Sequence, residues 1–418
     1  MGPTAASGPV TFTPAGPGMP ALAWRSRATT IDGVERELAR IWAQPTVVLD
    51  RDIDGDGVVD REIGARTSVM NLVVVARRPE VGERSAAIIQ ALTGRHPSRT
   101  LIVSPSDPDG PSWLDANIQA HCVLPSESAP ATCAETIYLT CGGESGRHLE
   151  AIIAPLLIHD LPVTVWWPDE LPFGTHAAAE VVELCNRLVV DGSTWHGSGL
   201  PKLRKLAALQ ERRPIAISDF ALVRQSRWRE AIASVFDHPD ILPFVQHLRR
   251  IAVTYGIRDE VDVESTNIVK PVYHAAWLAS RLEMRLVQPL APIAPRGGDG
   301  AVPAGPAAGL AASLRLNRRE VAVIIRPTLS EMPPGTTLRV ELTAAFRGVE
   351  LRADITAEQE AVHARVWRDG DRILERGFNA PRRKDTDLLA EAIEAGGRDR
   401  VAVGTLGMAA ELAEELER

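Results

Sequence analysis

SVMNLVVVARRPEVGERSAAIIQALTGRHPSRTLIVSPS, residues 68–106, contains two apolar runs that are separated by a helical pattern. Residues 68–76 form a nearly continuous apolar run, which is typical of a strand that is buried on both faces of a sheet. Residues 82–97 read as a helix, and residues 99–106 read as the next strand. Strand, helix and strand in this order predict two neighbouring parallel strands that are joined by a covering helix.

The alternation of strands and helices continues toward residue 213. Further strands are expected at residues 161–167 and 188–193, each beside a helical pattern. Two shorter strand candidates, residues 119–125 and 135–141, interrupt the alternation. We therefore predict an α/β domain over residues 22–214, with a largely parallel or mixed sheet and helices on both faces.

The pattern changes after about Pro214. Residues 227–256 read as helical with two proline interruptions, and residues 270–284 read as another helix. Short turns separate the strands that follow, which predicts an antiparallel meander. Those strand candidates are residues 311–317, 320–327, 336–346, 349–356 and 361–370.

Two helical patterns, residues 384–397 and 403–417, follow the strands. We therefore predict an α+β domain over residues 215–418. Its Pro/Gly-rich segment, residues 289–309, is expected to be an exposed loop or linker. The Pro/Gly/Ala-rich residues 1–21 are expected to form a disordered tail.

The bulk composition narrows the classes of function. The chain has 418 residues, a formal net charge of -8 and 45% hydrophobic residues. This charge argues against non-specific binding of nucleic acid, which needs clustered cations. The sequence has neither an apolar run of the roughly 18 residues that span a bilayer nor a secretory signal pattern. We therefore predict a cytoplasmic protein without membrane or nucleic-acid partners.

The chain contains four cysteines, which are too few for a disulfide framework in a chain of this length. The set formed by His121, Cys122, Cys133 and Cys141 matches no short zinc-ligand spacing. Free cysteine is commonly buried as a small hydrophobic side chain, and we predict that role here. The fourth cysteine is Cys185.

The stretch DIDGDGVVD, residues 52–60, is similar to the start of a calcium-binding loop. Calcium loops place oxygen ligands at alternate positions and end on a bidentate acid at position twelve. That position is Ile63 here, so the motif is incomplete. Two readings remain, an acidic hairpin turn or a calcium site, and no other cofactor is expected. The candidate calcium ligands are Asp52, Asp54, Asp56 and Asp60.

Arg95, His96 and Arg99 lie between a helix and a strand and are candidates for binding an anion such as a phosphate. A phosphate site normally uses a helix N-terminus after a strand, whereas this loop follows a helix. The alternative is a solvated connection. Elsewhere, His148, His159 and His176 stand without a catalytic motif, and single histidines of this kind are more often structural. The sequence therefore predicts a protein that is not an enzyme.

DLPVTVWWPDELPF, residues 160–173, places Trp166 beside Trp167 at the end of a strand. Adjacent strand residues point to opposite faces, so the two rings enter different layers. Either both rings are buried, or one lies at the rim of the sheet as part of a binding surface. Trp228 lies on another helix with an apolar stripe. The candidate partner-binding residues are Trp166, Trp167, Asp169, Phe173, Trp228 and Arg229.

Several segments, in this order and spacing, together resemble the OpcA family of glucose-6-phosphate dehydrogenase assembly proteins. The matching segments are RTSVMNLVVVA, GRHPSRTLIVSPSDPDGPSWLDANIQAHCVLP, HLEAIIAPLLIHDLPVTVWWPDELPF, LVVDGS, ISDFALVRQSRWREAIASVFD and RRKDTDLLAEAIEAGGRDRV.

The resemblance implies a non-catalytic, two-domain cytoplasmic protein. Its partner would be glucose-6-phosphate dehydrogenase, at the head of the oxidative pentose phosphate pathway. It would promote assembly of that enzyme or activate it allosterically through protein–protein interaction. The alternative, from the β/α alternation and the Arg95–Arg99 loop, is an α/β enzyme that binds a phosphorylated sugar or nucleotide. Fold alone does not establish such an activity.

Overall fold

The computed structural model divides the chain into two compact units. Unit 1 comprises Met1–Val190 and Asp385–Glu394, and unit 2 comprises Asp191–Lys384 and Ala395–Arg418. We expected a domain border after Pro214, whereas the units divide between Val190 and Asp191. The structure describes residues 8–9, 21–43, 48–51, 60–63, 65–123, 132–259, 265–293, 309–358 and 360–414.

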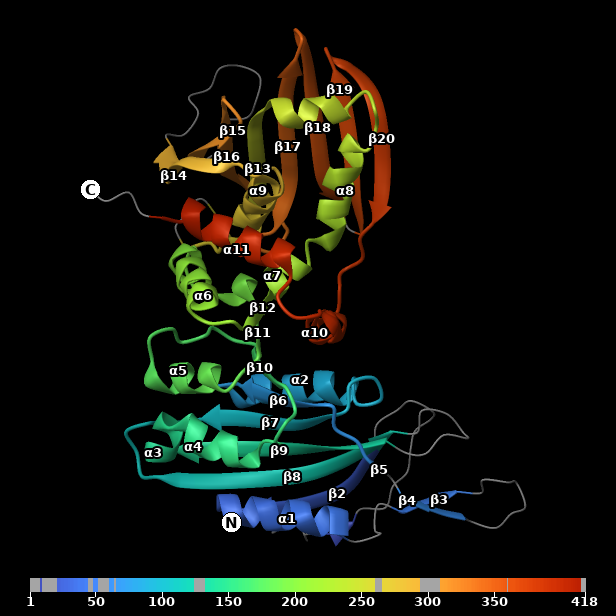
Figure 1. Cartoon of the computed structure of the whole chain (residues 1–418), viewed down its shortest axis with the longest axis vertical. Helices are drawn as coiled ribbons and strands as arrows, with labels where there is room; N and C mark the ends of the chain where they lie inside the picture. The colour runs from blue at the N-terminus through green and yellow to red at the C-terminus, as the bar shows by residue number, and fades with distance from the viewer. Residues whose placement is uncertain are drawn as a thin grey trace. The chain divides into compact units, whose positions relative to one another are not determined.

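Unit 1 is built on a mixed sheet. The strands are β1 (Gly8–Pro9), β2 (Ala21–Ala28), β5 (Ala65–Arg66), β6 (Met70–Val75), β7 (Ser98–Pro105), β8 (Trp113–Val123), β9 (Thr132–Gly142), β10 (Val163–Trp167) and β11 (Arg187–Val190). They follow the order β1-β2-β8-β9-β7-β6-β10-β11, with β5 beside β9. From β2 to β11, the labels in Figure 1 can be read in this order.

The centre of this sheet is parallel. Strands β9, β7, β6, β10 and β11 run in the same direction, whereas β2 and β8 are antiparallel to their neighbours. Every residue of β6 is buried, as expected of a central strand that is covered on both faces. The predicted α/β domain with a mixed sheet is therefore confirmed, and the two shorter strand candidates form parts of β8 and β9.

All helices of unit 1 except α10 lie between strands of this unit along the chain, and α10 follows β20 (Asp371–Asn379). Helix α1 buries Val34, Leu38 and Ile41, which recur at the spacing of one helical face. The helices are α1 (Ile31–Ala43), α2 (Pro79–Gln90), α3 (Glu144–Arg147), α4 (Leu149–Ile153), η1 (Ala154–Leu156), α5 (His176–Glu183) and α10 (Asp385–Glu394). A separate antiparallel pair is formed by β3 (Val48–Arg51) and β4 (Asp60–Ile63).

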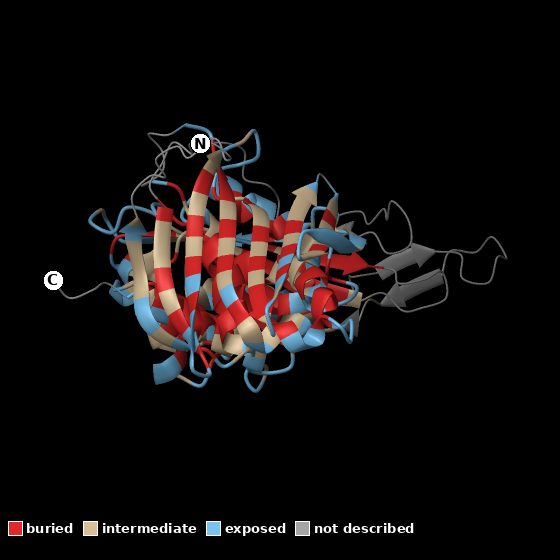
Figure 2. Ribbon diagram, turned by 90° about the horizontal axis from the view of Figure 1, so that it is seen from above, coloured by how far each residue is buried: buried red, intermediate tan, exposed pale blue. Residues whose placement is uncertain are grey.

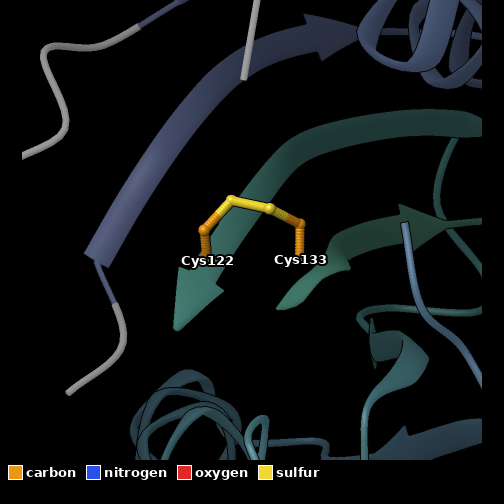
Figure 3. Close-up of a disulfide and its surroundings, with 2 residues drawn as sticks. All are labelled: Cys122 and Cys133. Atoms are coloured by element: carbon orange, nitrogen blue, oxygen red, sulfur yellow. A yellow bond between two sulfur atoms is a disulfide. The ribbon is translucent and has the colours of Figure 1, made fainter. Parts of the chain in front are cut away.

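A disulfide joins the end of β8 to the start of β9 (Figure 3). Cys122 and Cys133 are directly opposite each other in the antiparallel pairing, with their Cα atoms 4.0 Å apart. Both are completely buried. The prediction that Cys122 and Cys133 are free cysteines is therefore wrong, because strand pairing brings the two together. Cys141 is a buried thiol, as predicted, and Cys185 is a buried thiol as well.

Unit 2 contains an eight-stranded sheet. Its strands are β13 (Leu248–Ile257), β14 (Arg285–Ile293), β15 (Gly309–Leu316), β16 (Arg319–Leu329), β17 (Thr337–Phe346), β18 (Val349–Glu358), β19 (Ala361–Arg368) and β20 (Asp371–Asn379). Their order is β14-β15-β16-β13-β17-β18-β19-β20. Among the described strands of this sheet, only β13 and β16 pair in parallel, so the predicted antiparallel meander is confirmed on both sides of β13.

Three strands of this sheet differ from the sequence-based prediction. Residues 248–256 were expected to be helical but form β13, because Leu248, Ile251 and Val253 are buried on one face of the sheet. The Pro/Gly-rich segment expected to be a loop begins within β14, and its residues 294–308 lie outside the described residues. Strand β20 was not predicted, because it lacks a buried alternating pattern.

Helices α8 and α9 pack on the same face of the unit 2 sheet (Figure 1). Helix α9 contacts β13, β16 and β17, and helix α8 contacts β18, β19 and β20. Figure 2 shows buried and partly exposed residues alternating along these strands, as a sheet with one covered face requires. The remaining elements are η2 (Gly192–Thr194), α6 (Leu200–Arg212), β12 (Ala216–Asp219), α7 (Phe220–Val223), α8 (Ser226–Phe236), η3 (Leu242–His247), α9 (Val269–Arg281) and α11 (Arg400–Leu412).

Candidate functional site

The connection order of unit 1 creates a crevice at one edge of the sheet. Strand β6 pairs with β7 on one side and with β10 on the other, and all three are parallel. The chain passes from β6 to β7, and only later crosses to β10 on the opposite side. Such a reversal of strand order opens a crevice beyond the carboxyl ends of the strands, where α/β proteins commonly bind ligands.

A pocket of about 530 Å³ occupies this position. Its walls include the last residues of the three strands, Val75 of β6, Pro105 of β7 and Trp167 of β10. His148 and His176 line it from the segments that follow β9 and β10. We refer to it as the switch-point pocket.

Hydrogen bonds fix the loops beside this pocket. The backbone N–H of Ser106 donates to the carbonyl of Cys141 at 2.8 Å, and that of Gly143 donates to the carbonyl of Asp107 at 2.9 Å. Gly143 has a φ of 59°, and a Cβ there would lie 2.6 Å from the carbonyl oxygen of Gly110. Only glycine fits this close approach, so the loops after β7 and β9 are held together.

Two histidines share one carboxylate at the edge of the switch-point pocket. Oε1 of Glu180 lies 3.1 Å from Nδ1 of His148 and 2.8 Å from Nε2 of His176. Glu180 is mostly buried, whereas His176 is largely exposed. The hydrogen bond to Glu180 is the main cause that raises the pKa of His148 above its ordinary value.

The sequence did not indicate this cluster. His148 and His176 were interpreted as single structural histidines, because they are 28 residues apart in the sequence and no motif joins them. One local signal was present: His176 and Glu180 are four residues apart, which places them on one face of a helix. Contact between α4 and α5 then adds His148, which precedes α4.

The adjacent tryptophans are both buried. Trp166 is 3% exposed and Trp167 is 2% exposed. This is the first of the two alternatives, in which neither ring lies at the rim, since β10 is a central strand with two covered faces. Trp167 in addition forms part of the wall of the switch-point pocket.

The other candidate partner-binding residues make local contacts. Asp169 accepts a 2.6 Å hydrogen bond from Arg78, and Phe173 is partly exposed. In unit 2, the Trp228 ring packs 5.1 Å from the His274 ring, and Arg229 donates to the carbonyl of Leu222 at 2.6 Å. The six residues thus belong to two separate units, and partner binding by them stays a prediction.

The candidate anion-binding residues do not converge. Arg99 is buried and donates to Glu135 at 2.6 Å. Arg95 and His96 instead contact Glu394, at 2.5 and 2.8 Å. Each of the three side chains therefore already contacts a carboxylate, which does not favour a shared anion site.

The proposed calcium loop cannot be placed. Residues 52–59 lie outside the described residues, and Asp60 is described only as the first residue of β4. The candidate calcium ligands Asp52, Asp54, Asp56 and Asp60 therefore remain a prediction from the sequence.

A second candidate surface lies on the face of the unit 2 sheet opposite α8 and α9. Residues from five strands form a ladder of ion pairs there. Arg339 donates to Asp354 at 2.5 Å and to Glu341 at 2.7 Å, and Arg365 donates to Glu375 at 2.8 Å. We call this the outer face; its defining residues are Arg250, Arg339, Glu341, Arg352, Asp354, Arg365, Trp367 and Glu375.

One aromatic side chain interrupts this charged ladder. The guanidinium of Arg352 lies 4.3 Å from the centre of the Trp367 ring, a cation–π arrangement. Trp367 is partly exposed and, with Arg250 and Arg352, lines a surface hollow of about 500 Å³. Tryptophan and arginine are the residue types that contribute most often to the binding energy of protein interfaces.

Within the residues that the structure describes, no helix combines the length and apolar character that crossing a membrane requires.

Comparison with solved structures gives distant likenesses. KijD10, a 3-ketoreductase from Actinomadura kijaniata, has a TM-score of 0.44 and 10% identity, over 82% of this chain and 95% of that chain. The WlbA dehydrogenase from Thermus thermophilus has a TM-score of 0.41 and 12% identity, over 83% and 95%. Likeness at this level carries no inference about activity.

Comparison with curated proteins gives two bacterial relatives. A protein of Nostoc punctiforme, provisionally named OxPP cycle protein OpcA, is 26% identical over 49% of this chain and 42% of that protein. A protein of Synechococcus elongatus with the same provisional name is 24% identical over 48% of this chain and 42% of that protein. The aligned part thus spans about two fifths of the length of these relatives.

Two family models match the chain in succession. Residues 89–208 match the glucose-6-phosphate dehydrogenase subunit N-terminal domain, and residues 215–402 match the corresponding C-terminal domain. Both models belong to OpcA, and together they span most of the chain. The chain therefore belongs to the OpcA family of glucose-6-phosphate dehydrogenase assembly proteins.

Proposed function

We propose that this protein binds glucose-6-phosphate dehydrogenase in the cytoplasm, promotes its assembly or activation, and catalyses no reaction itself. The observation that carries this proposal is the ordered match of both family models over most of the chain. The oxidative pentose phosphate pathway enters through the provisional names of the curated relatives.

A protein that forms no bond can activate an enzyme only through differential binding. It has to bind the active oligomer more tightly than the inactive form, because equal affinity for both shifts no equilibrium. A shift from about 1% to about 99% active enzyme requires a preference of about 5.5 kcal/mol in total. Such a preference is more readily supplied by a broad surface than by one or two side chains.

We propose the outer face of unit 2 as the surface that docks on the dehydrogenase. It combines an array of ion pairs with the Trp367 and Arg352 pair at a hollow. A polar, partly hydrated surround with an aromatic and arginine centre is typical of protein interfaces. The buried Trp166 and Trp167 cannot supply such a centre without a rearrangement of unit 1.

The proposal is tested by mixing the purified protein with its cognate glucose-6-phosphate dehydrogenase. Complex formation is followed by co-purification, and dehydrogenase activity is assayed with and without this protein. We expect a complex at micromolar concentrations and an increase in activity. A mixture that shows neither a complex nor any change in activity would remove the basis for this function.

The switch-point pocket favours a second candidate function, the binding of a small molecule by unit 1. The pocket lies where α/β proteins bind ligands, and ionisable side chains reach its edge. A thermal-shift screen with phosphorylated sugars and nucleotides tests it, because a ligand of the native state raises the melting temperature. A ligand that binds in the switch-point pocket should raise the melting temperature of the wild type by a different amount from that of a folded Trp167→Ala variant.

A further inference from the structure

The His148, His176 and Glu180 cluster has the composition of a metal site. Imidazole nitrogens and a carboxylate oxygen are the usual ligands of zinc and related transition metals in proteins. In such sites two side chains often come from one helical turn and a third from another element. Here His176 and Glu180 come from α5, and His148 comes from the turn between α3 and α4.

We propose that these three side chains bind one divalent transition metal ion, with zinc as the best match. Their ligand atoms all lie within 4.8 Å of one another. Neighbouring ligand atoms of a tetrahedral zinc ion are roughly 3.3 Å apart, because each bond is about 2.0 to 2.1 Å long. The separations of 3.1 and 2.8 Å from Glu180 to the two histidines are close to that value. An ion therefore enters with small side-chain movements.

Two further observations support a metal over a simple ion pair. Oε1 of Glu144 lies 3.3 Å from Nε2 of His148, so Nδ1 of the same ring is left for the ion. Metal-binding histidines commonly donate their second N–H to a carboxylate in this way. In addition, Oε2 of Glu180 is buried and has no hydrogen-bond partner among the described residues. Buried carboxylate oxygens are normally satisfied, and a bound cation would satisfy this one.

The position of the cluster gives the ion a role. His148 and His176 both line the switch-point pocket, so a coordination position that the protein leaves open is accessible to a ligand there. Zinc sites with three protein ligands keep such a position. The ion would also connect the segments that follow β9 and β10. Metal binding here does not depend on dehydrogenase binding. A negative result for one of the two proposals therefore does not count against the other.

The test is direct metal binding to the full chain. Protein treated with a chelator is titrated with zinc chloride by calorimetry, and with cobalt chloride, whose absorption spectrum reports tetrahedral coordination. We expect one equivalent to bind at about pH 7.5. Binding should weaken as the pH falls toward about 5.5, because protons compete for the histidine nitrogens.

Variants assign the binding to these residues. His176→Gln and Glu180→Gln should each lower zinc affinity by at least about tenfold, and Glu144→Gln by about tenfold or more through the orientation of His148. His159→Gln removes an exposed histidine of unit 1 outside the cluster and should leave affinity unchanged. Melting curves without metal establish that each variant is folded.

Two results would overturn the proposal. One is the absence of a bound equivalent in wild-type protein. The other is equal zinc affinity in wild type, His176→Gln and Glu180→Gln, which would identify adventitious binding elsewhere.

Discussion

Tyr273 donates a 2.7 Å hydrogen bond to Oδ2 of Asp219 inside unit 2, where both side chains are buried. Oδ1 of Asp219 accepts from the backbone N–H groups of Gly192 and Ala221, each at 2.8 Å. Burial is the main cause that raises the pKa of Asp219 to about 6, followed by the charge of Asp191, although the hydrogen bonds act in the opposite direction.

This raised pKa predicts that Asp219 makes unit 2 less stable as the pH rises. The native carboxyl holds its proton more tightly than the unfolded one, whose pKa is 3.8. The stability that it contributes is therefore present at low pH and is lost between about pH 4 and pH 6. At pH 7 the ionised group costs about 3 kcal/mol.

Asp219→Asn removes this dependence and retains the shape. The amide oxygen can accept from both backbone N–H groups, and the amide N–H can donate to Tyr273. We expect urea unfolding to show Asp219→Asn as the more stable protein at pH 7, with the difference shrinking toward pH 4. A difference that is the same at both pH values would contradict the raised pKa.

The buried tryptophans predict a large loss of stability on truncation. Trp166→Ala should lower the free energy of unfolding by about 3 to 5 kcal/mol, because it leaves a cavity in the core. Trp167→Ala should cost less, since the new space joins the switch-point pocket. Trp113, which is 43% exposed, is the matched control. Trp113→Ala should change stability by less than about 1 kcal/mol. If Trp166→Ala melts like the control, the burial of this ring is wrong.

The Cys122–Cys133 disulfide predicts a defined thiol count. Protein that is purified and denatured without reductant should show two reactive thiols, Cys141 and Cys185, and four after reduction. Reduction should lower the stability of the wild type by up to about 3 kcal/mol, because the cross-link restricts the unfolded chain. A variant with alanine at both positions should not respond to reductant. Four thiols before reduction would show that the pair does not form.

The sequence predicted those elements whose local pattern reflects their burial. The apolar run 68–76 became β6, and the spacing of Val34, Leu38 and Ile41 became the inner face of α1. Strand β13 was missed because its local sequence resembles a helix. It forms a strand through pairing with β16 and β17, which lie far along the chain. Strand β20 was missed because its side chains remain largely exposed.

Less of the candidate site than of the fold could be predicted from the sequence. The switch-point pocket depends on the order in which parallel strands pair, and a single sequence does not specify that order. His148 and His176 meet only because α4 and α5 pack together after β9 and β10. The tryptophan pair was visible in the sequence, but its burial depends on which strand occupies the centre of the sheet.

The outer face predicts which substitutions weaken dehydrogenase binding. Trp367→Ala should raise the dissociation constant of the complex by more than about tenfold, because truncated aromatic centres of interfaces commonly cost 2 kcal/mol or more. Its partly exposed ring should leave the melting temperature nearly unchanged. Trp113 is an exposed tryptophan of unit 1, so Trp113→Ala serves as the control for loss of an aromatic side chain. If Trp367→Ala and Trp113→Ala both bind the dehydrogenase as tightly as the wild type does, the outer face is not the docking surface.

The proposed activation requires that this protein binds the active oligomer of glucose-6-phosphate dehydrogenase preferentially. Sedimentation velocity of the dehydrogenase, with increasing amounts of this protein and parallel activity assays, measures that preference most directly. We expect that the active oligomer becomes more populated, with this protein bound to it, and that activity rises in proportion. An unchanged oligomer distribution, with this protein sedimenting alone at micromolar concentrations of both, would contradict it.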